Sequence, residues 1–530
     1  MRSALLVAAL AVPSMGLATP RDEWAAADFI APSAQFTDPD RATKLAAGFG
    51  EVDRLVNEFL AREHVPGAAW GIVIDGKVAH IGTSGLRDVA TGAKVQSDSV
   101  FRIASMTKSF TAIAILQLRD AGKLSLDDPV EKFLPELKAL HYPTADSPRL
   151  TLRHLLTHSG GFPEDNPWGD QQLSLDEASF TALLRSGIPF SNPPGVAYEY
   201  SNYGFALLGR VITRVSGMPY SRYIEKHVLR PLDMRSTTLE PAKVPTQQLA
   251  LGYRWEDNQW KLEPQLADGA FGAMGGMLTS IDDLTRYVGA FLAAWPPRDG
   301  AESPPLSRSS LREMQQAWRP NNATVTHTPE GALQLVVASY GYGLRISQTC
   351  HFRHVVAHTG GLPGFGSQMR WLPEYGVGLI GFGNRTYTPW GKVFDAALPA
   401  LLATGGLQPR QVQPAPAFTS AQVAVSSLVI NGWDDAVARG MAAMNLFLDS
   451  DITHRRAMLA ALHAEIGGTC RVRQGSTRLE NSLRGTWLID CEGGTAQASI
   501  TLAPTVPAKV QFLEVKRVPP EGDAPAKTCQ

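Results

Sequence analysis

A serine and a lysine that lie three residues apart could act as a nucleophile with its own base. The stretch FRIASMTKSF contains Ser105 and Lys108. Residues i and i+3 share a face of a helix, so the lysine amine can lie over the serine hydroxyl. A serine hydroxyl is a poor nucleophile until a neighbouring base removes its proton, and a lysine can be that base when burial lowers its pKa. Taken alone, the pair also fits a helix-capping serine followed by a solvent-facing lysine.

A second stretch, PPGVAYEYSNYGFALLG, contains a tyrosine and an asparagine in alternate positions. Tyr200 and Asn202 point to the same side of an extended chain. A tyrosine beside a lysine ammonium can carry a proton, because the positive charge lowers its pKa. An asparagine offers a donor and an acceptor to a substrate amide. The alternative is a turn that leads into an amphipathic helix, with Tyr200 packed in the core.

A third stretch, VVAHTGGLPGFGSQMRWLPEYGVGLIGFGN, begins as a strand and reaches a histidine, a threonine and two glycines. These residues are His358, Thr359, Gly360 and Gly361. Two glycines allow a substrate to approach the backbone closely. If Ser105 starts a helix, its backbone N–H and that of Gly361 could both donate to an oxyanion. The alternative is a glycine-rich hairpin with an incidental histidine.

The order S-x-x-K, Y-x-N, H-T-G resembles the serine β-lactamase superfamily, and specifically its branch of class C β-lactamases, D-aminopeptidases, β-lactamase-like esterases and penicillin-binding-protein-like chains. The resemblance covers about Glu51–Ala403. It includes the connecting segments LTLRHLLTHSGGFP, PLDMRSTTL and GGMLTSIDDLTRYV. It implies an antiparallel sheet flanked by helices, plus a helical domain, with the active site between them.

The resemblance also implies a role for each motif residue. Ser105 is the expected nucleophile, and Lys108 and Tyr200 share the general-base and proton-transfer work, with the first proton acceptor left open. Asn202 is expected to orient the substrate, and the backbone N–H groups of Ser105 and Gly361 to form the oxyanion hole. The residues expected to line the opposing strand are His358, Thr359 and Gly360. No metal and no organic cofactor is implied.

One position departs from the pattern of the penicillin-recognising members, which usually carry a lysine where this chain has His358. A lysine is a permanent cation that can hold a substrate carboxylate, whereas a histidine is largely neutral at pH 7. We therefore expect an exported serine hydrolase that forms an acyl-enzyme on an ester, an amide or a D-amino-acid peptide. The alternatives are a true β-lactamase or DD-peptidase, and a non-catalytic sensor of cell-wall peptides.

The elements that must position these residues can be read from periodicity and turn residues. An apolar stripe from Val52 predicts a helix, Asp75-Gly76 predicts a hairpin, and Ser280 predicts the start of another helix. The other predicted elements are helices over 105–121 and 203–215 and strands over 341–346, 368–372 and 377–382. Strands at both ends with helices between them predict an α+β fold, whose antiparallel sheet is closed by the N- and C-terminal segments.

Composition excludes several kinds of partner. The chain has 530 residues, 44% of them hydrophobic, and 49 basic against 50 acidic side chains. A net charge of −1 gives no electrostatic case for nucleic acid or an anionic membrane. The expected partner is a small-molecule or peptide substrate, and the oligomeric state stays open. Cys470 and Cys491 flank paired strands and are predicted to form a disulfide; Cys350 and Cys529 could pair or stay free.

Domain boundaries follow from shifts in composition. MRSALLVAALAVPSMGLA, residues 1–18, is predicted to be a cleavable signal peptide, so the chain is expected to be secreted or periplasmic. No later stretch approaches the roughly 20 apolar residues of a transmembrane helix. The other predicted parts are an N-terminal arm over 19–50, the hydrolase domain over 51–404, a Pro-rich linker over 405–420 and a small α+β accessory domain over 421–530.

Overall fold

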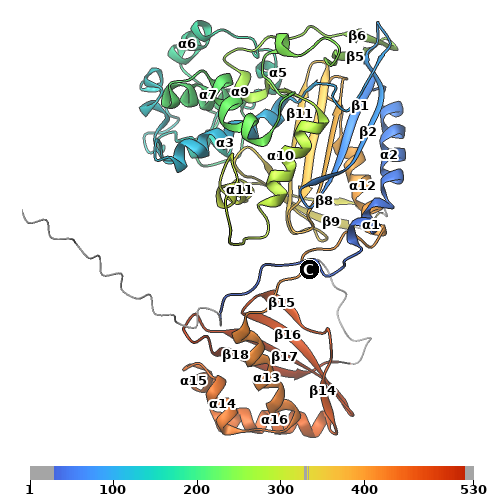
Figure 1. Cartoon of the computed structure of the whole chain (residues 1–530). Helices are drawn as coiled ribbons and strands as arrows, with labels where there is room; N and C mark the ends of the chain where they lie inside the picture. The colour runs from blue at the N-terminus through green and yellow to red at the C-terminus, as the bar shows by residue number, and fades with distance from the viewer. Residues whose placement is uncertain (1–28, 328–330, 332, 520–530) are drawn as a thin grey trace, which may run out of the picture. The chain divides into compact units, whose positions relative to one another are not determined.

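The computed structural model of the chain describes residues 29–327, 331 and 333–519, which form two compact units (Figure 1). The larger unit begins at Phe36 and runs to Arg410. The smaller unit contains the described residues 29–35 and 411–519. The predicted signal peptide, 1–18, lies outside the described residues.

A nine-stranded antiparallel sheet is the framework of the larger unit, in the order β3-β2-β1-β13-β12-β11-β10-β9-β8. Strand β1 pairs with β13, with Ala68 opposite Gly383 and Ile74 opposite Val377. This confirms that the two ends of the unit close one sheet. The strands are β1 (Gly67–Ile74), β2 (Lys77–Asp88), β3 (Ala93–Lys94), β8 (Arg319–His327), β9 (Leu333–Tyr340), β10 (Arg345–Gln348), β11 (Val355–Leu362), β12 (Phe365–Leu372) and β13 (Val377–Gly383).

Helices cover both faces of the sheet (Figure 1). On one face, α2 (Phe49–Arg62) buries Val52, Val56 and Phe59 against the sheet and α12 (Gly391–Ala403). On the other face, α10 (Ile281–Ala293) lies between the sheet and the helical segments. The remaining helices are α1 (Arg41–Ala46), α3 (Thr107–Asp120), α4 (Leu152–Leu156), α5 (Asn166–Gly169), α6 (Glu177–Ser186), α7 (Asn202–Ser216), α8 (Tyr220–Ile224), α9 (Gly272–Gly275) and α11 (Arg308–Met314).

Short elements join these parts. Two small antiparallel pairs are β4 (Phe101–Arg102) with β7 (Leu278–Thr279), and β5 (Tyr253–Glu256) with β6 (Gln259–Leu262). The 3₁₀ and π turns are η2 (Ala104–Met106), η3 (Val130–Lys132), η4 (Pro135–Leu137), η5 (Glu225–Leu229), η6 (Arg230–Leu232) and η7 (Pro241–Lys243). The pair β4–β7 fixes the chain directly before η2 and so sets where Ser105 lies.

Helix α3 is the central helix of the larger unit. Every side chain from Thr107 to Leu116 is buried, which is the pattern of a helix surrounded by protein on all sides. The sequence predicted one helix from Ser105, but Ser105 lies in the 3₁₀ turn η2 and the α-helix begins at Thr107. Such a turn is a common start for a buried helix, because it tightens the first backbone hydrogen bonds.

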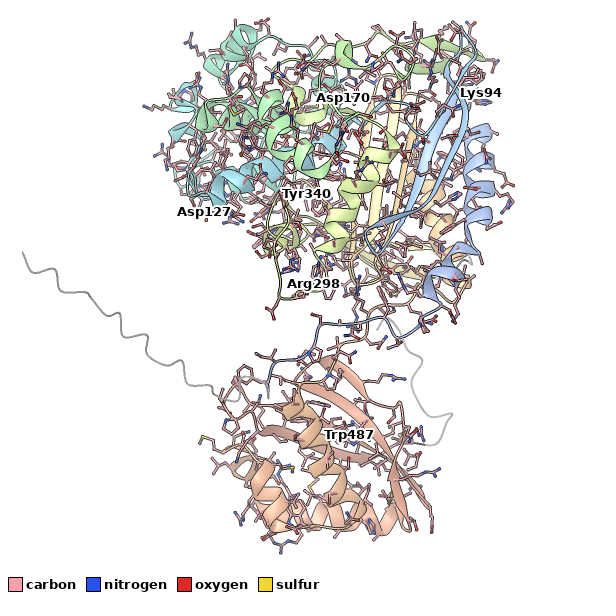
Figure 2. The ribbon with its side chains drawn as sticks, viewed as in Figure 1. Lys94, Asp127, Asp170, Arg298, Tyr340 and Trp487 are labelled. Atoms are coloured by element: carbon pink, nitrogen blue, oxygen red, sulfur yellow. A yellow bond between two sulfur atoms is a disulfide. The ribbon has the colours of Figure 1, made fainter. Side chains whose placement is uncertain are left out.

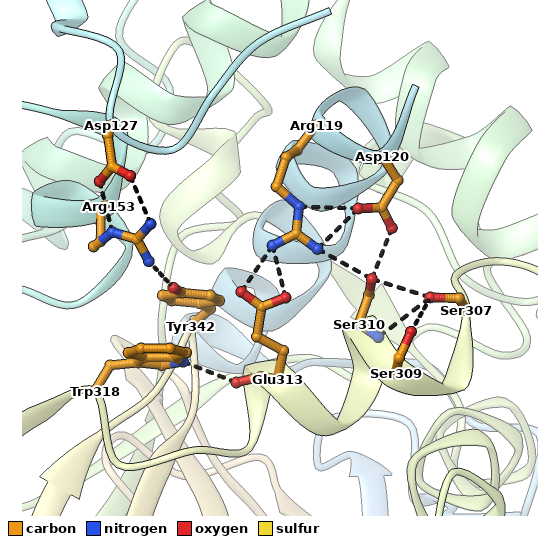
Figure 3. A network of polar contacts seen from close by, with 10 residues as sticks. All are labelled: Arg119, Asp120, Asp127, Arg153, Ser307, Ser309, Ser310, Glu313, Trp318 and Tyr342. Carbon is orange, nitrogen blue, oxygen red and sulfur yellow. Dashed lines mark hydrogen bonds and ion pairs between the residues drawn. The ribbon is translucent and has the colours of Figure 1, made fainter. Parts of the chain in front are cut away.

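A polar network ties α3 to α11 and to the turn between β9 and β10 (Figure 3). Arg119 donates to both carboxylate oxygens of Glu313, at 2.8 and 2.7 Å. Arg153 donates to the Tyr342 hydroxyl, and the Tyr342 ring stacks on Trp318 with centroids 5.3 Å apart. A planar guanidinium group that donates several hydrogen bonds is held in one orientation, and it fixes the segments that it joins. The network therefore fixes the turn from which β10 starts.

The predicted strand over 341–346 begins four residues too early, because the chain turns over 341–344 and only 345–346 lie in a strand. Strand β9 ends at Tyr340 and β10 begins at Arg345. Gly343 has a φ of 67°, and a Cβ there would lie 2.7 Å from the carbonyl oxygen of Lys108. Only glycine fits a left-handed turn pressed against another backbone. The alternating pattern around the glycines looked like one continuous strand.

The smaller unit combines a five-stranded sheet with helices, as the α+β prediction requires. Its strands are β14 (Cys470–Val472), β15 (Arg478–Asn481), β16 (Arg484–Cys491), β17 (Gly494–Leu502) and β18 (Val510–Arg517). Its helices are α13 (Pro416–Ile430), α14 (Asp435–Met441), α15 (Leu446–Asp449) and α16 (Ile452–Ile466). Trp487, labelled in Figure 2, is fully buried in its core.

Two sequence expectations for this part can be compared with the structure. Cys470 and Cys491 form a disulfide where β14 and β16 pair directly. Cys350 also takes part in a disulfide, and Cys529 lies outside the described residues.

The predicted linker over 405–420 is too long at its C-terminal end, because α13 begins at Pro416. Proline at the first helical position suits a helix start, so its presence did not mark a continuing linker.

Among the residues that the structure describes, no helix combines the length and the apolar character needed to cross a bilayer.

Candidate active site

Ser105 lies in a strained turn beside the sheet. The residue before it, Ala104, has a φ of 49°, a left-handed conformation that costs a non-glycine residue roughly 1–3 kcal/mol. Ser105 is 8% exposed, whereas its neighbours Ala104 and Met106 are 1% and 0% exposed. Strain of this kind is tolerated where the surrounding structure holds a reacting group in one orientation.

The amine of Lys108 lies over the Ser105 hydroxyl. Its Nζ is 3.0 Å from Ser105 Oγ, 2.7 Å from Asn202 Oδ1 and 2.8 Å from the carbonyl oxygen of Met274. The side chain is fully buried. Burial lowers the pKa of the Lys108 amine to about 7, against the opposing effect of the Asp170 carboxylate. An amine with that pKa is partly neutral near pH 7 and can accept a proton from the serine.

Tyr200 completes the group around the nucleophile. Its ring centroid is 4.8 Å from Lys108 Nζ. Burial raises the pKa of the Tyr200 phenol, and a hydrogen bond with Ser105 opposes the rise. The phenol therefore stays protonated at neutral pH and can give or relay a proton, while the lysine is the group whose charge changes.

His158 supports Tyr200 from behind. Its ring centroid lies 4.2 Å from that of Tyr200, and its Nδ1 accepts the backbone N–H of Ser201 at 3.1 Å. Burial, and then the charge of Lys108, holds the pKa of His158 well below its usual value, so the ring is neutral. The stretch LLTHSGG did not indicate this role, because its pattern is typical of a helix end followed by a turn.

Asn202 contacts the lysine rather than solvent. Its Oδ1 accepts from Lys108, its Nδ2 donates to Asn166 Oδ1 at 3.1 Å, and its side chain is fully buried. Its backbone N–H donates to Asp165 Oδ1 at 2.6 Å, where α7 begins. The amide expected to orient a substrate therefore orients Lys108 in this structure.

Strand β11 brings the third motif to the nucleophile. Strand β10 pairs only with Val355–Ala357, so the rest of that edge of β11 lies beside η2. A Cβ at Gly360 would lie 2.0 Å from the carbonyl oxygen of Ile103 and 2.4 Å from Ser367 Oγ. Glycine is thus required for the close approach. Gly361 follows, and Thr359 is exposed.

His358 is turned away from solvent. The side chain is fully buried, with Nδ1 2.6 Å from the carbonyl oxygen of Thr359 and Nε2 2.8 Å from the Tyr340 hydroxyl. A carbonyl can only accept, so Nδ1 carries the proton and Tyr340 donates to Nε2. Burial, with the charges of Arg345 and Lys108, holds the pKa of His358 well below its usual value. The imidazole is neutral and fixes β11, and its burial does not support the expected place among substrate-contacting residues.

One positively charged residue beside Tyr200, Arg345, was not identified from the sequence. Arg345, the first residue of β10, is exposed, and its guanidinium carbon lies 5.7 Å from the Tyr200 ring centroid. Among the described residues, no carboxylate forms an ion pair with it. A lone arginine after a glycine-rich turn carries no signal that separates it from ordinary surface arginines. Within the ranges that the structure describes, no group of three or more His, Cys, Asp or Glu side chains is arranged to hold a metal ion.

Comparison with known proteins gives a consistent result. The model of the β-lactamase family matches residues 52–404. Protein flp of Staphylococcus aureus (strain MW2) is 28% identical over 347 residues, which is 64% of this chain and 64% of that protein. The D-alanyl-D-alanine-carboxypeptidase/endopeptidase AmpH of Escherichia coli (strain K12) is 29% identical over 268 residues, or 49% of this chain and 64% of AmpH. The similarity therefore spans 64% of the length of these relatives.

Solved structures share the fold. The octameric penicillin-binding protein homologue from Pyrococcus abyssi has a TM-score of 0.56 at 22% identity, covering 86% of this chain and 96% of that one. The D-alanine carboxypeptidase AmpC from Burkholderia cenocepacia has a TM-score of 0.53 at 19% identity, covering 68% and 99%. These similarities confirm the expected sheet-and-helix fold. Since the family model matches more than half of the chain, from residue 52 to residue 404, the chain belongs to the β-lactamase family.

Proposed function

We propose that this chain is a serine hydrolase that forms an acyl-enzyme at Ser105 and acts on substrates with a free carboxylate, D-amino-acid peptides first among them. The observation that carries the proposal is the buried Lys108 amine, held 3.0 Å from Ser105 Oγ by Asn202 and Met274. The names of AmpH and AmpC, both carboxypeptidases for D-alanine, support the same substrate class.

The geometry supports an ordinary acyl-transfer sequence. The neutral Lys108 amine takes the proton of Ser105, and Oγ attacks the substrate carbonyl carbon. The negative charge that forms on the carbonyl oxygen would be stabilised by the backbone N–H groups of Ser105 and Gly361. As the bond to the leaving group breaks, the leaving amine receives a proton through Tyr200 and Lys108. A water molecule then attacks the ester carbonyl, and Ser105 recovers its proton as the acid departs.

Arg345 is the group we assign to the substrate carboxylate. His358 cannot supply a charge, because it is neutral and buried. Arg345 is exposed, lies over the Tyr200 ring and has no acidic partner among the described residues. An arginine binds a carboxylate through two parallel hydrogen bonds. With this cation present, the absence of a lysine at position 358 no longer argues against carboxylate-bearing substrates.

Arg345→Gln tests this assignment. We expect kcat/KM for a peptide ending in D-Ala-D-Ala to fall roughly 10- to 100-fold, the effect of losing a charge-assisted hydrogen bond. The same peptide with a C-terminal carboxamide should be hydrolysed slowly by both proteins and change little. Steady-state kinetics with the two peptides measures the difference. Arg345→Lys should recover part of the loss, and an equal loss on both peptides would reject the carboxylate role.

We also propose that the chain is exported. The N-terminal stretch 1–18 has the composition of a signal peptide, and the Cys470–Cys491 disulfide is typical of an oxidising compartment. Expression of the full-length sequence in a diderm bacterium should place the protein in the periplasm without residues 1–18. Intact-mass measurement of the periplasmic fraction tests this, and a cytosolic product that keeps the N-terminal stretch would contradict it.

A further inference from the structure

A hydrogen bond joins the helical side of the site to the sheet side. The Tyr387 hydroxyl donates to Asp170 Oδ2 at 2.7 Å. Tyr387 lies in the loop after β13, and Asp170, labelled in Figure 2, directly follows α5. We call this pair the strap. Asp170 is 2% exposed and Tyr387 is 51% exposed, so the tyrosine ring lies toward solvent and the carboxylate lies inside.

Tyr387, and the residue that precedes Asp170, each contact a residue of the motifs around Ser105. A Cβ at Gly361 would lie 2.4 Å from Cδ1 of the Tyr387 ring, so the ring packs directly on that glycine. A Cβ at Gly169 would lie 2.8 Å from Cβ of Asn202, so the residue before Asp170 packs on that asparagine. The strap therefore joins the strand that approaches the nucleophile to the segment that packs on Asn202, the residue that holds Lys108.

The sheet end of the strap is fixed. Tyr387 has a φ of 51°, an unfavourable conformation for a residue with a side chain, and its N–H donates to the carbonyl oxygen of Phe365 at 3.1 Å. The neighbouring Thr386 Oγ1 accepts the N–H of Gly364 at 2.7 Å, and Thr388 Oγ1 donates to the carbonyl oxygen of Arg385 at 2.8 Å. A loop bonded on both sides keeps the ring in one place, so the strap opens only if its hydrogen bond to Asp170 breaks.

The strap lies where the acyl part of a substrate must go. In the proposed mechanism, the leaving group departs toward Tyr200, because it takes its proton there, and its carboxylate binds Arg345. The two groups attached to a carbonyl carbon point in different directions, so this mechanism requires the acyl group to extend away from Tyr200, and we expect it on the side of Gly361 and Asn202. Tyr387 contacts the first of these residues, and Gly169, which precedes Asp170, contacts the second.

We propose that the Asp170–Tyr387 strap sets the upper size of the acyl group that Ser105 accepts. A small acyl group fits with the strap closed, whereas a bulky one must break the Tyr387–Asp170 hydrogen bond. Trp168 on α5 is 43% exposed and would offer an apolar surface to a bulky group once the strap is open. This inference rests on the proposed acyl-enzyme function and names the determinant of its acyl specificity.

The test compares two esters that share one leaving group. The measured quantity is kcat/KM for p-nitrophenyl phenylacetate divided by kcat/KM for p-nitrophenyl acetate. This ratio should rise about tenfold in Tyr387→Phe, which loses only the hydroxyl. Tyr387→Ala, which also loses the ring, should raise the ratio at least as much. Tyr375→Phe is the matched control, because Tyr375 bonds the carbonyl oxygen of His351 at the opposite end of the β12–β13 hairpin. Its ratio should equal that of the wild type.

Thermal unfolding of all four proteins should give similar midpoints, which shows that the ratios compare folded enzymes. If Tyr387→Phe keeps the wild-type ratio, the Tyr387–Asp170 hydrogen bond does not limit acyl size and the proposal is wrong. This holds even if Tyr387→Ala changes the ratio, since the ring alone would then be the barrier. A wild-type protein that hydrolyses neither ester and is not acylated at Ser105 rejects the proposed function, and the strap proposal with it. Hydrolysis by the wild type with unchanged variants rejects the strap alone.

Discussion

Ser105→Ala should lower kcat for every substrate roughly 10⁴- to 10⁶-fold, the loss seen when a hydrolase loses its nucleophile. No neighbouring side chain can replace the serine, because Lys108 and Tyr200 are both fixed around its hydroxyl. The fold should survive, since alanine keeps the Cβ and removes a single oxygen atom. Kinetics on the best substrate, with thermal unfolding of the same preparation, measures both effects.

A fluorophosphonate probe provides the second measurement for Ser105. The probe should label the wild type and leave Ser105→Ala unlabelled, and mass spectrometry should place the adduct on the peptide that contains residue 105. Ser186→Ala is a suitable control, because that serine is exposed and bonds only the end of its own helix. A folded Ser105→Ala that keeps most of its activity would refute the mechanism. A wild type that binds cell-wall peptides but takes no label would favour the non-catalytic sensor.

The sequence predicted the residues of this site that belong to compact local motifs. Ser105 and Lys108 are three residues apart, and Tyr200 and Asn202 alternate, so each pair suggested its own geometry before any fold was known. In the structure the buried amine of Lys108 bonds Ser105 and Asn202 and lies 4.8 Å from the ring centroid of Tyr200. What the motifs could not give was the direction of each side chain. Asn202 and His358 both face protein, because burial and backbone partners decide their orientation.

The residues that the sequence did not reveal act across long separations. Arg345 meets Tyr200 only because β10 starts at a turn that the network of Arg153 and Tyr342 holds in place. Tyr387 meets Asp170 across 217 positions of the sequence. Neither pair has a local pattern, since a contact between distant segments depends on strand order and loop geometry. The same reason explains the misplaced strand at 341–346, where tertiary packing against Lys108 sets the turn.

Lys108→Met should lower kcat strongly, although less than loss of the serine does. The variant keeps a side chain of similar length and removes the amine that is 3.0 Å from Ser105 Oγ. General-base catalysis contributes roughly 10²- to 10⁴-fold, so kcat should fall by about that factor. In the wild type, kcat/KM should rise about tenfold per pH unit and level off near pH 7, where Lys108 loses its proton. The residual activity of the variant should lack this rise.

The same substitution should change how stability depends on pH. In the unfolded chain a lysine binds its proton up to about pH 10.4, whereas burial lowers the pKa of Lys108 in the folded chain to about 7. Between these values the unfolded state binds more protons than the folded state, so stability rises with pH. From pH 7 to pH 9 this group should add roughly 2–3 kcal/mol to the free energy of unfolding of the wild type. Lys108→Met has no such group, so its free energy of unfolding should increase by roughly 2–3 kcal/mol less than that of the wild type from pH 7 to pH 9.

Urea unfolding of both proteins at pH 7 and pH 9 measures this difference, and titrating groups distant from Lys108 cancel in the comparison. Lys108→Met loses the penalty of burying an ammonium but leaves the acceptors Asn202 Oδ1 and Met274 O without a donor. The absolute stabilities at pH 7 should therefore be similar, and only the change with pH is diagnostic. If the two proteins change in parallel between pH 7 and pH 9, the folded-state amine keeps an ordinary pKa. A lysine still charged at neutral pH could not take the proton of Ser105, and the proposed base would have to be replaced.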